Sequence, residues 1–249
     1  MADGQAYGNQ IRPTRNVIAL MTLIEKVEAR QAFLPGMAVF YGPSGFGKTF
    51  AAIHANLSRN AVHVQCKKFW TQKSLAEAIL GELRAPVSRR TTLSQMFDDV
   101  VSALVRDPRP LIIDEADHLF NKDMLEFVRG IHDDTQNTVV LIGEENLPQN
   151  LTKIERVHNR IAGWVAAEPA DLEDARQLAR YYANDVEIAE DLLVAIVKAS
   201  GGRIRRVSNN LSWVREDART RGVTKLTLEQ WGHRDFYTGE APLGRRNLA

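Results

Sequence analysis

The sequence predicts an α/β protein in which helices cover both faces of a five-stranded parallel sheet, followed by a small all-helical domain. Short apolar runs alternate with helical segments as far as Pro169, as in parallel sheets. Beyond Pro169 the segments have helical periodicity, with no strand between them. The expected divisions are a flexible N-terminus at 1–12, the α/β domain at 13–169, the helical domain at 170–236 and a flexible tail at 237–249.

The five strands are expected where apolar runs are short and bounded by turn or charged residues. A strand that is buried on both faces is apolar at successive positions rather than at alternate ones. The runs lie at residues 37–41, 61–66, 110–114, 138–143 and 163–169.

Helices are expected where apolar residues recur every three or four positions. Thr14 is the expected N-cap of the first helix, and Ser74 with Glu77 forms an expected capping box. The helical segments are 15–30, 48–58, 74–84, 92–106, 122–132 and 147–161, followed by 171–183, 189–200 and 206–220.

Composition excludes several classes of protein. The chain has 249 residues, 25% of them charged, and a formal net charge of +1, which gives no overall signal of nucleic-acid binding. A single cysteine, Cys66, excludes an internal disulfide and fits a reducing compartment. The polar N-terminus lacks the apolar region of a signal peptide, and no run reaches 18 apolar residues. We therefore expect a cytoplasmic protein without a membrane partner.

Residues 42–49 read GPSGFGKT and match the phosphate-loop pattern G-x-x-x-x-G-K-[ST]. In such a loop, glycines permit close approach, and the N–H groups at the start of the following helix face the phosphate oxygens. Lys48 is expected to reach the β- and γ-phosphates, and Thr49 to offer its hydroxyl to Mg²⁺. The expected nucleotide-binding residues are Gly42, Pro43, Ser44, Gly45, Phe46, Gly47, Lys48, Thr49 and Phe50.

Asp114 ends the apolar run 110–114 and is followed directly by Glu115. The first carboxylate suits a magnesium-bound water, and the second suits an attacking water in phosphoryl transfer. A kinase of small molecules would not need this second acid, so the pair favours ATP hydrolysis. We expect ATP and Mg²⁺ as cofactors, Thr49 and Asp114 at the metal, and Glu115 with Lys48 in catalysis. The interval between the two motifs leaves room for another strand.

At this point the chain resembles the AAA+ ATPases, a class of P-loop NTPase, over about residues 12–235. The phosphate loop, the Asp-Glu pair, the arginines before the fifth strand and a helical lid with GGRIR occur in that family's order. The resemblance implies that Arg160, or alternatively Arg156, is an arginine finger acting on a neighbouring subunit's nucleotide. It also implies that Arg205 is the sensor-2 arginine, which touches the γ-phosphate within its own subunit. A finger supplied by a neighbour requires oligomers.

The chain departs from the family after the fourth strand, where a small polar residue usually helps to position water. Here the sequence is Gly143-Glu144-Glu145-Asn146, and either Glu144 or Asn146 is available for that role. Since an acid near the γ-phosphate is electrostatically unfavourable, we expect slow hydrolysis, as in a timer.

Within the family, the compact build resembles the DNA-transposition regulators of the phage Mu B and TnsC type. The helical lead-in RPTRNVIALMTLIEKV, the segment AVFYGPSGFGKT and the small lid carry this resemblance. The N-terminal DNA-binding module of the Mu B type looks absent. The resemblance implies non-specific duplex DNA, further copies in a filament or ring, and a transposase as partners, in a bacterial or phage-infected cell. The alternatives are a helicase loader of the DnaC or IstB kind and an ATP-dependent protein-interaction switch without a DNA role.

Basic residues after the second strand are the expected DNA contacts. The resemblance implies that the segment CKKFWTQK faces the central channel of a ring or filament, where Lys67 and Lys68 would neutralise backbone phosphates. Contacts to phosphates are independent of base sequence and sensitive to salt. Phe69 and Trp70 are expected to pack in the core. A second basic segment, 199–225, has seven Lys and Arg residues against two acids. The expected DNA-binding residues are Lys67, Lys68, Lys73, Arg89 and Arg90.

Overall fold

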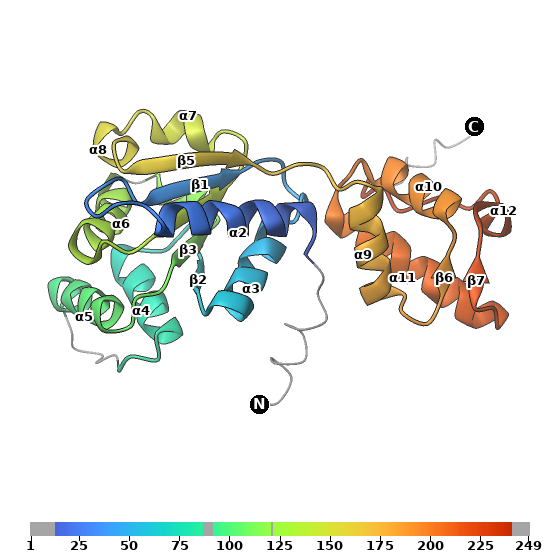
Figure 1. Ribbon diagram of the computed structural model, residues 1–249, viewed down its shortest axis with the longest axis horizontal. Coiled ribbons are helices and arrows are strands. Elements are labelled where there is room, and N and C mark those ends of the chain that lie inside the picture. The colour runs from blue at the N-terminus through green and yellow to red at the C-terminus, as the bar shows by residue number, and fades with distance from the viewer. Residues whose placement is uncertain (1–12, 87–91, 121, 241–249) are drawn as a thin grey trace, which may run out of the picture. The chain divides into compact units, whose positions relative to one another are not determined.

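The computed structural model describes residues 13–86, 92–120 and 122–240 of the chain (Figure 1). Its contacts separate into two compact units, residues 1–168 and 169–249. Among the described residues, no helix combines the length and apolarity that crossing a membrane requires.

The first unit is built on a parallel sheet of five strands. The strands are β1 (Met37–Tyr41), β2 (Val62–Gln65), β3 (Leu111–Asp114), β4 (Val139–Gly143) and β5 (Ile161–Ala166). Their order is β2-β3-β4-β1-β5, and every neighbouring pair is parallel. The predicted five-stranded α/β fold is therefore confirmed. Because β4 lies between β1 and β3, one strand separates the strand before the phosphate loop from the strand that ends in Asp114.

Helices cover both faces of this sheet (Figure 1). In β1, Ala38 and Phe40 pack in the core cluster shared with α2 and α3, whereas Met37 and Val39 pack in the cluster shared with α4, α5 and α6. Burial on both faces explains why the strands read as uninterrupted apolar runs. The helices are α2 (Arg15–Glu28), α3 (Lys48–Arg59), α4 (Gln72–Glu82), α5 (Leu93–Arg106), the 3₁₀ helix η1 (Ala116–Leu119), α6 (Lys122–Thr135), α7 (Leu147–Leu151) and α8 (Glu155–His158).

Helix α4 begins two residues earlier than the sequence predicts, so the expected capping box of Ser74 and Glu77 is wrong. Thr71 is the N-cap, and its side-chain oxygen accepts a hydrogen bond from the Ser74 N–H at 3.3 Å. Thr14 does occupy the N-cap position of α2, but its side chain makes no capping hydrogen bond.

The single helix expected at 147–161 is also wrong, because the chain forms two short helices there, α7 and α8. Between them Ile154 packs against the core, which requires the backbone to turn. Helix α8 ends at His158 and β5 begins at Ile161, so Arg160 lies outside the helix that carries Arg156.

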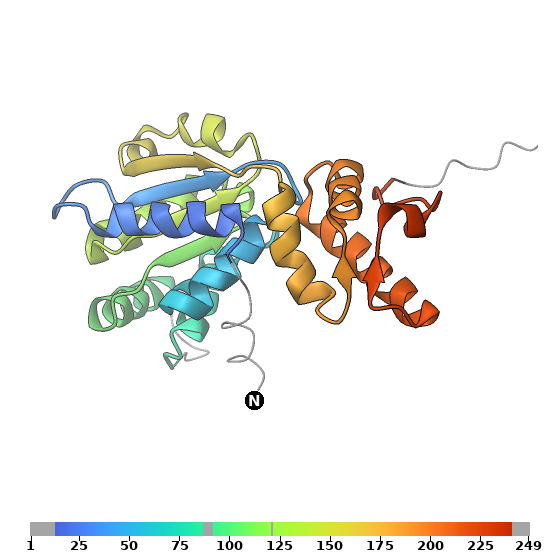
Figure 2. The ribbon, with the colours of Figure 1, turned by 45° about the vertical axis from the view of Figure 1, so that its right-hand side comes forward.

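The second unit is mainly helical, with α9 (Leu172–Tyr182), α10 (Glu190–Ser200), α11 (Ile204–Arg221) and α12 (Leu228–Trp231). Its helices, orange to red in Figure 2, pack around one apolar cluster that includes Leu178, Ile196 and Leu211. It is not entirely helical, because β6 (Glu187–Ile188) and β7 (Lys225–Leu226) form a parallel pair. Strands of two residues are too short to show a periodic pattern in the sequence.

Candidate active site

Residues 42–47 form the turn between β1 and α3. Gly45 and Gly47 have φ values of 88° and 86°, in the left-handed region where a side chain would be strained. Gly47 is the N-cap of α3, a helix of 12 residues, and the first turn of a helix has N–H groups without partners inside the helix. This turn can therefore bind an anion such as a phosphate.

The Lys48 side chain folds back onto the turn. Its Nζ donates hydrogen bonds to the carbonyl oxygens of Gly42, at 2.6 Å, and of Pro43, at 2.9 Å. The ammonium group thus lies at the turn itself, where it would meet a bound phosphate.

Burial lowers the pKa of Lys48 below its ordinary value, and the charges of four neighbouring carboxylates counteract part of that effect. A polyphosphate entering this site needs cationic compensation beyond one lysine, which favours binding together with a divalent cation. The four carboxylates, in order of decreasing effect, belong to Asp114, Glu115, Glu144 and Asp117.

Asn16 holds the turn against the rest of the unit, a role that sequence reasoning missed. Its Nδ2 donates to the carbonyl oxygens of Phe46 and Glu168, both at 2.7 Å, and its Oδ1 accepts from the Glu168 N–H at 2.9 Å. The Asn16 side chain is buried, and these three hydrogen bonds join α2, the turn and the segment after β5. The sequence did contain a signal for this role, because Asn16 is a polar residue on the apolar face of the predicted helix 15–30.

Asp114, the last residue of β3, is only 2% exposed. Its Oδ1 accepts a hydrogen bond from the Glu115 N–H at 2.9 Å. Its Oδ2 is buried and has no hydrogen-bond partner within the described chain, and the His63 Nε2 lies 3.8 Å from it. A buried carboxylate oxygen without a partner fits Mg²⁺ or a water bound to Mg²⁺.

In residues 13–86, 92–120 and 122–240, no three His, Cys, Asp or Glu side chains form a metal-binding cluster. Mg²⁺ commonly binds through one or two protein oxygens together with nucleotide phosphates, and that arrangement is the one these residues fit. Thr49 lies in the first turn of α3 and is half-buried, so the structure places it directly after the phosphate-loop lysine.

Glu115 has a left-handed backbone, with φ 56° and ψ 39°. For a residue with a Cβ this conformation costs about 1–2 kcal/mol, so the surrounding structure must hold it in place. Burial raises the pKa of the Glu115 carboxyl, the charge of Asp114 raises it further, and His118 and Lys48 oppose the rise. The result is a carboxylate that accepts protons more readily than an exposed one.

Asp117 of η1 reaches the end of β4, which the sequence did not predict. Its Oδ2 accepts a hydrogen bond from the Glu144 N–H at 2.6 Å. A Cβ at Gly143 would lie 2.2 Å from the same Oδ2, so the carboxylate occupies the space that a side chain at position 143 would need. Glu144 and Asn146 are both exposed, and either remains available to position water.

The two arginines of the 155–160 region lie at the other edge of the sheet. The phosphate loop, Asp114 and Gly143 follow the carboxyl ends of their strands, whereas Arg156 and Arg160 precede the amino end of β5. A strand of six residues, as β5 is, spans roughly 20 Å. A side chain cannot cover that distance, so these arginines cannot contact the phosphate loop of their own chain.

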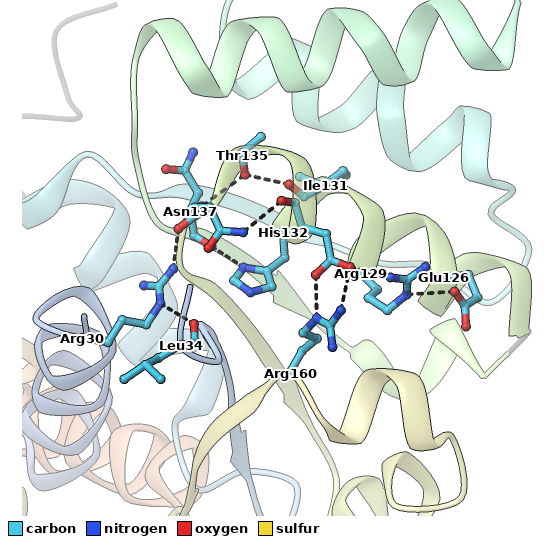
Figure 3. Close-up of polar contacts among 11 residues, drawn as sticks. Arg30, Leu34, Glu126, Arg129, Ile131, His132, Thr135, Asn137 and Arg160 are labelled. Carbon is cyan, nitrogen blue, oxygen red and sulfur yellow. Dashed lines mark hydrogen bonds and ion pairs between the residues drawn. The ribbon is translucent and has the colours of Figure 1, made fainter. Parts of the chain in front are cut away.

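Arg160 is bound within its own unit (Figure 3). Its Nε donates to Asp133 Oδ1 at 2.7 Å, and a terminal nitrogen donates to Asp133 Oδ2 at 3.2 Å. Arg129 pairs with the same Asp133 and also with Glu126. Arg156, in contrast, is exposed.

Arg205 belongs to the second unit, in the first turn of α11, and its side chain is exposed. It follows Gly201 and Gly202, whose φ values of 56° and 66° form the turn between α10 and α11.

The expected DNA-binding residues fall partly within the described chain. Lys67 and Lys68 are exposed between β2 and α4, and Lys73 is half-buried in the first turn of α4. Phe69 is 81% exposed, so the expectation that it packs in the core is wrong. Trp70 does pack against the core, and the Lys67 Nζ lies 5.9 Å from the centre of its ring. Arg89 and Arg90 lie outside the described residues.

The second basic segment, 199–225, is largely neutralised by ion pairs within its own unit. Asp217 lies within the segment, whereas the other two acidic partners, Asp185 and Glu187, precede it, so the charge count of the segment alone did not include them. The pairs are Arg215 and Arg219 with Asp185, Arg221 with Asp217, and Lys225 with Glu187.

Solved structures share this fold. The chain is 18% identical to the ORC1 protein of Aeropyrum pernix, solved in complex with DNA, with a TM-score of 0.62 over 88% of this chain and 64% of that one. The ORC2 protein of Aeropyrum pernix, solved in ADPNP and ADP complexes, is 17% identical, with a TM-score of 0.64 over 86% of this chain and 64% of that one. RuvB of Thermotoga maritima, described as a Holliday junction branch migration motor, is 21% identical, with a TM-score of 0.58 over 88% and 67% of the two chains.

At these identities the similarity shows a shared fold, and the chain spans less than two thirds of the length of the two ORC proteins. No curated protein sequence matches the chain significantly. Residues 30–151, which contain the phosphate loop and the Asp114-Glu115 pair, match the family model described as an AAA domain. Residues 30–151 thus match an AAA domain, and the fold of the chain is similar to that of the ORC and RuvB proteins.

Proposed function

We propose that the protein is a slow, Mg²⁺-dependent ATPase of the AAA+ type whose copies assemble and bind DNA without sequence preference. The main support for this proposal is a set of functional groups that lie together at one edge of the sheet. An anion-binding turn, the Lys48 ammonium, the buried Asp114 carboxylate and the strained Glu115 follow the ends of β1 and β3.

Each group has a role in hydrolysis. The nucleotide phosphates would bind the N–H groups of residues 42–50, and Lys48 would exchange two carbonyl partners for β- and γ-phosphate oxygens. Asp114 and Thr49 would hold Mg²⁺, which compensates the charge of the phosphates. Glu115 would accept a proton from the attacking water, and the products are ADP and inorganic phosphate.

The position of the arginines supports assembly. Because Arg156 and Arg160 precede β5, at the opposite edge of the sheet, either would act on the nucleotide of a neighbouring copy. Arg205 would contact the γ-phosphate of its own chain. The arginine from the neighbour would make hydrolysis depend on assembly, and loss of the γ-phosphate would loosen the contact between copies.

The DNA part of the proposal rests on the exposed Lys67 and Lys68, with Lys73 beside them, and on the relative that was solved with DNA. Lysines on a loop contact phosphates rather than base edges, so this binding would be non-specific and salt-dependent.

The finer proposal is that the assembly regulates DNA transposition. Its support is the order of the elements, in which helix α2 precedes the strand and phosphate loop of the first unit and a mainly helical second unit follows β5. A transposase would engage the ATP-bound filament or ring on duplex DNA and stimulate the hydrolysis that dismantles it. The exposed ring of Phe69 favours a second candidate, a helicase loader that prefers single strands.

Electron microscopy and sedimentation with ADPNP, Mg²⁺ and either duplex or single-stranded DNA test the proposal. We expect assemblies that require both nucleotide and DNA, and weaker DNA binding with unchanged nucleotide affinity after Lys67→Glu with Lys68→Glu. Filaments on duplex DNA favour the transposition regulator, and closed complexes with a helicase favour the loader. A protein that stays monomeric with ADPNP and DNA contradicts the assembly proposal.

A further inference from the structure

The loop between β2 and α4, residues 66–71, presents an aromatic ring to solvent. Phe69 is 81% exposed, and the two residues before it, Lys67 and Lys68, are also exposed. The ends of the loop are fixed, because Cys66 is 3% exposed and Trp70 packs against the core. The fold therefore anchors the residues on both sides of the tip and leaves the ring of Phe69 outside.

The same loop is attached to the candidate active site. The Cys66 N–H donates a hydrogen bond to the Asp114 carbonyl oxygen at 2.9 Å, which continues the β2–β3 ladder beyond the pair of Gln65 and Asp114. At the other end, the Thr71 side chain caps α4. A backbone hydrogen bond thus connects Asp114, the expected Mg²⁺ ligand, directly to the first residue of the loop that carries Phe69.

We propose that the ring of Phe69 stacks on the face of an unstacked nucleobase while Lys67 and Lys68 bind the flanking phosphates. The inference rests on the proposed DNA binding and adds that this loop contacts bases as well as the backbone. A flat apolar group beside two cations complements a nucleic acid strand, in which flat base faces alternate with anionic phosphates. A purely apolar protein partner would leave both ammonium groups without compensation.

Two DNA structures offer such a base. In a single strand the face is accessible, and stacking on an aromatic side chain is tolerant of sequence. In a duplex the ring would have to enter between two base pairs and unstack them, as apolar wedges do in the minor groove. The shared chemistry is the base face, and the experiment separates its two sources.

The test measures affinity of the full chain, with ADPNP and Mg²⁺, for a single-stranded oligonucleotide and for the matching duplex, each with 2-aminopurine at its centre. Phe69→Ala is expected to weaken single-strand binding by about 5-fold to 150-fold and to remove the change in 2-aminopurine fluorescence. Phe69→Trp should retain affinity, whereas Phe69→Leu should not. Phe33→Ala is the matched control, because Phe33 is 88% exposed but lies before β1, away from this loop.

The salt dependence separates stacking from phosphate contacts. Phe69→Ala should leave the slope of log affinity against log salt unchanged, whereas Lys67→Ala with Lys68→Ala should reduce that slope by about 1.4 on single strands. If Phe69→Ala also removes the 2-aminopurine fluorescence change on the duplex, then Phe69 stacks on a base that is exposed where two base pairs of the duplex separate. Wild-type binding with no effect of Phe69→Ala on either DNA, or full affinity in Phe69→Leu, overturns the stacking inference alone. A wild-type chain that binds neither DNA overturns the proposed function instead.

Discussion

Arg160 donates two hydrogen bonds to Asp133, at 2.7 and 3.2 Å, and thereby ties the start of β5 to α6 (Figure 3). Burial by itself raises the pKa of Asp133, but the hydrogen bond and charge of Arg160, together with the charge of Arg129, outweigh it and hold that pKa below its ordinary value. The carboxylate therefore stays ionised at neutral pH and holds the guanidinium in a fixed position. Asp133 thus fixes the position of the Arg160 side chain, whereas Arg156, four residues earlier in the chain, is exposed.

The first prediction concerns the arginine that we propose acts between copies. Arg160→Ala should lower ATP hydrolysis in the DNA-bound assembly by about 10³-fold or more, as loss of an arginine finger does. A mixture of Arg160→Ala and Lys48→Ala copies should recover activity, because an intact nucleotide site then meets an intact arginine from its neighbour. Steady-state phosphate release measures both.

Arg156→Ala removes the same charge four residues earlier and is the matched control. If Arg156→Ala loses activity and is complemented by Lys48→Ala, while Arg160→Ala only lowers the melting temperature, then Arg156 is the finger and Arg160 is structural.

The second prediction concerns Glu115. Glu115→Gln keeps the size of the side chain and its hydrogen-bonding capacity but removes the proton acceptor, so ATP should bind while hydrolysis falls by about 10²-fold or more. Assemblies formed with ATP should then persist longer than those of the parent, as light scattering would follow. Faster disassembly of the variant would contradict the role given to Glu115.

The third prediction concerns the close approach at the end of β4. Gly143→Ala should destabilise the first unit by about 1–3 kcal/mol, because the added Cβ would lie 2.2 Å from Asp117 Oδ2 and 2.7 Å from Leu147 Cδ2. Urea denaturation measures the change. The double variant Gly143→Ala with Asp117→Ala should recover part of the loss, and no recovery would mean that Leu147 is the main obstacle.

The fourth prediction concerns the pH dependence of the second unit. A hydrogen bond from Arg215, opposed by burial and aided by Arg219, holds the pKa of Asp185 at about 2, below the ordinary 3.8. A lowered pKa contributes stability above pH 3.8 that is lost as the pH falls toward 2.

Asp185→Asn should therefore lower the unfolding midpoint at neutral pH, with the difference from the parent shrinking below pH 3.8 and vanishing once the pH is below about 2. Unfolding curves at a series of pH values measure it. A difference that stays constant with pH would show that the carboxylate charge has no part in the stability.

Much of the fold could be predicted because local periodicity and burial act together. The apolar run 37–41 forms a strand in which four of the five residues are fully buried. Both faces of a covered sheet are buried, so successive apolar residues are expected in such a strand. The phosphate-loop pattern could be identified because a glycine turn before a helix is a local requirement of anion binding. The two-residue strands β6 and β7 could not, since pairing between residues 187 and 225 depends on how the intervening helices pack.

The sequence by itself determined the alternation of strands and helices and the position of the GPSGFGKT turn, because both follow from neighbouring residues. Only the tertiary structure decided that Asn16 holds that turn, that Asp117 fills the space beside Gly143, and that Arg160 binds Asp133. It also decided that Phe69 faces solvent while Trp70, one residue later, is partly buried and packs against the core. Such contacts join residues distant in the chain, and whether a side chain is buried depends on which surfaces the fold brings against it.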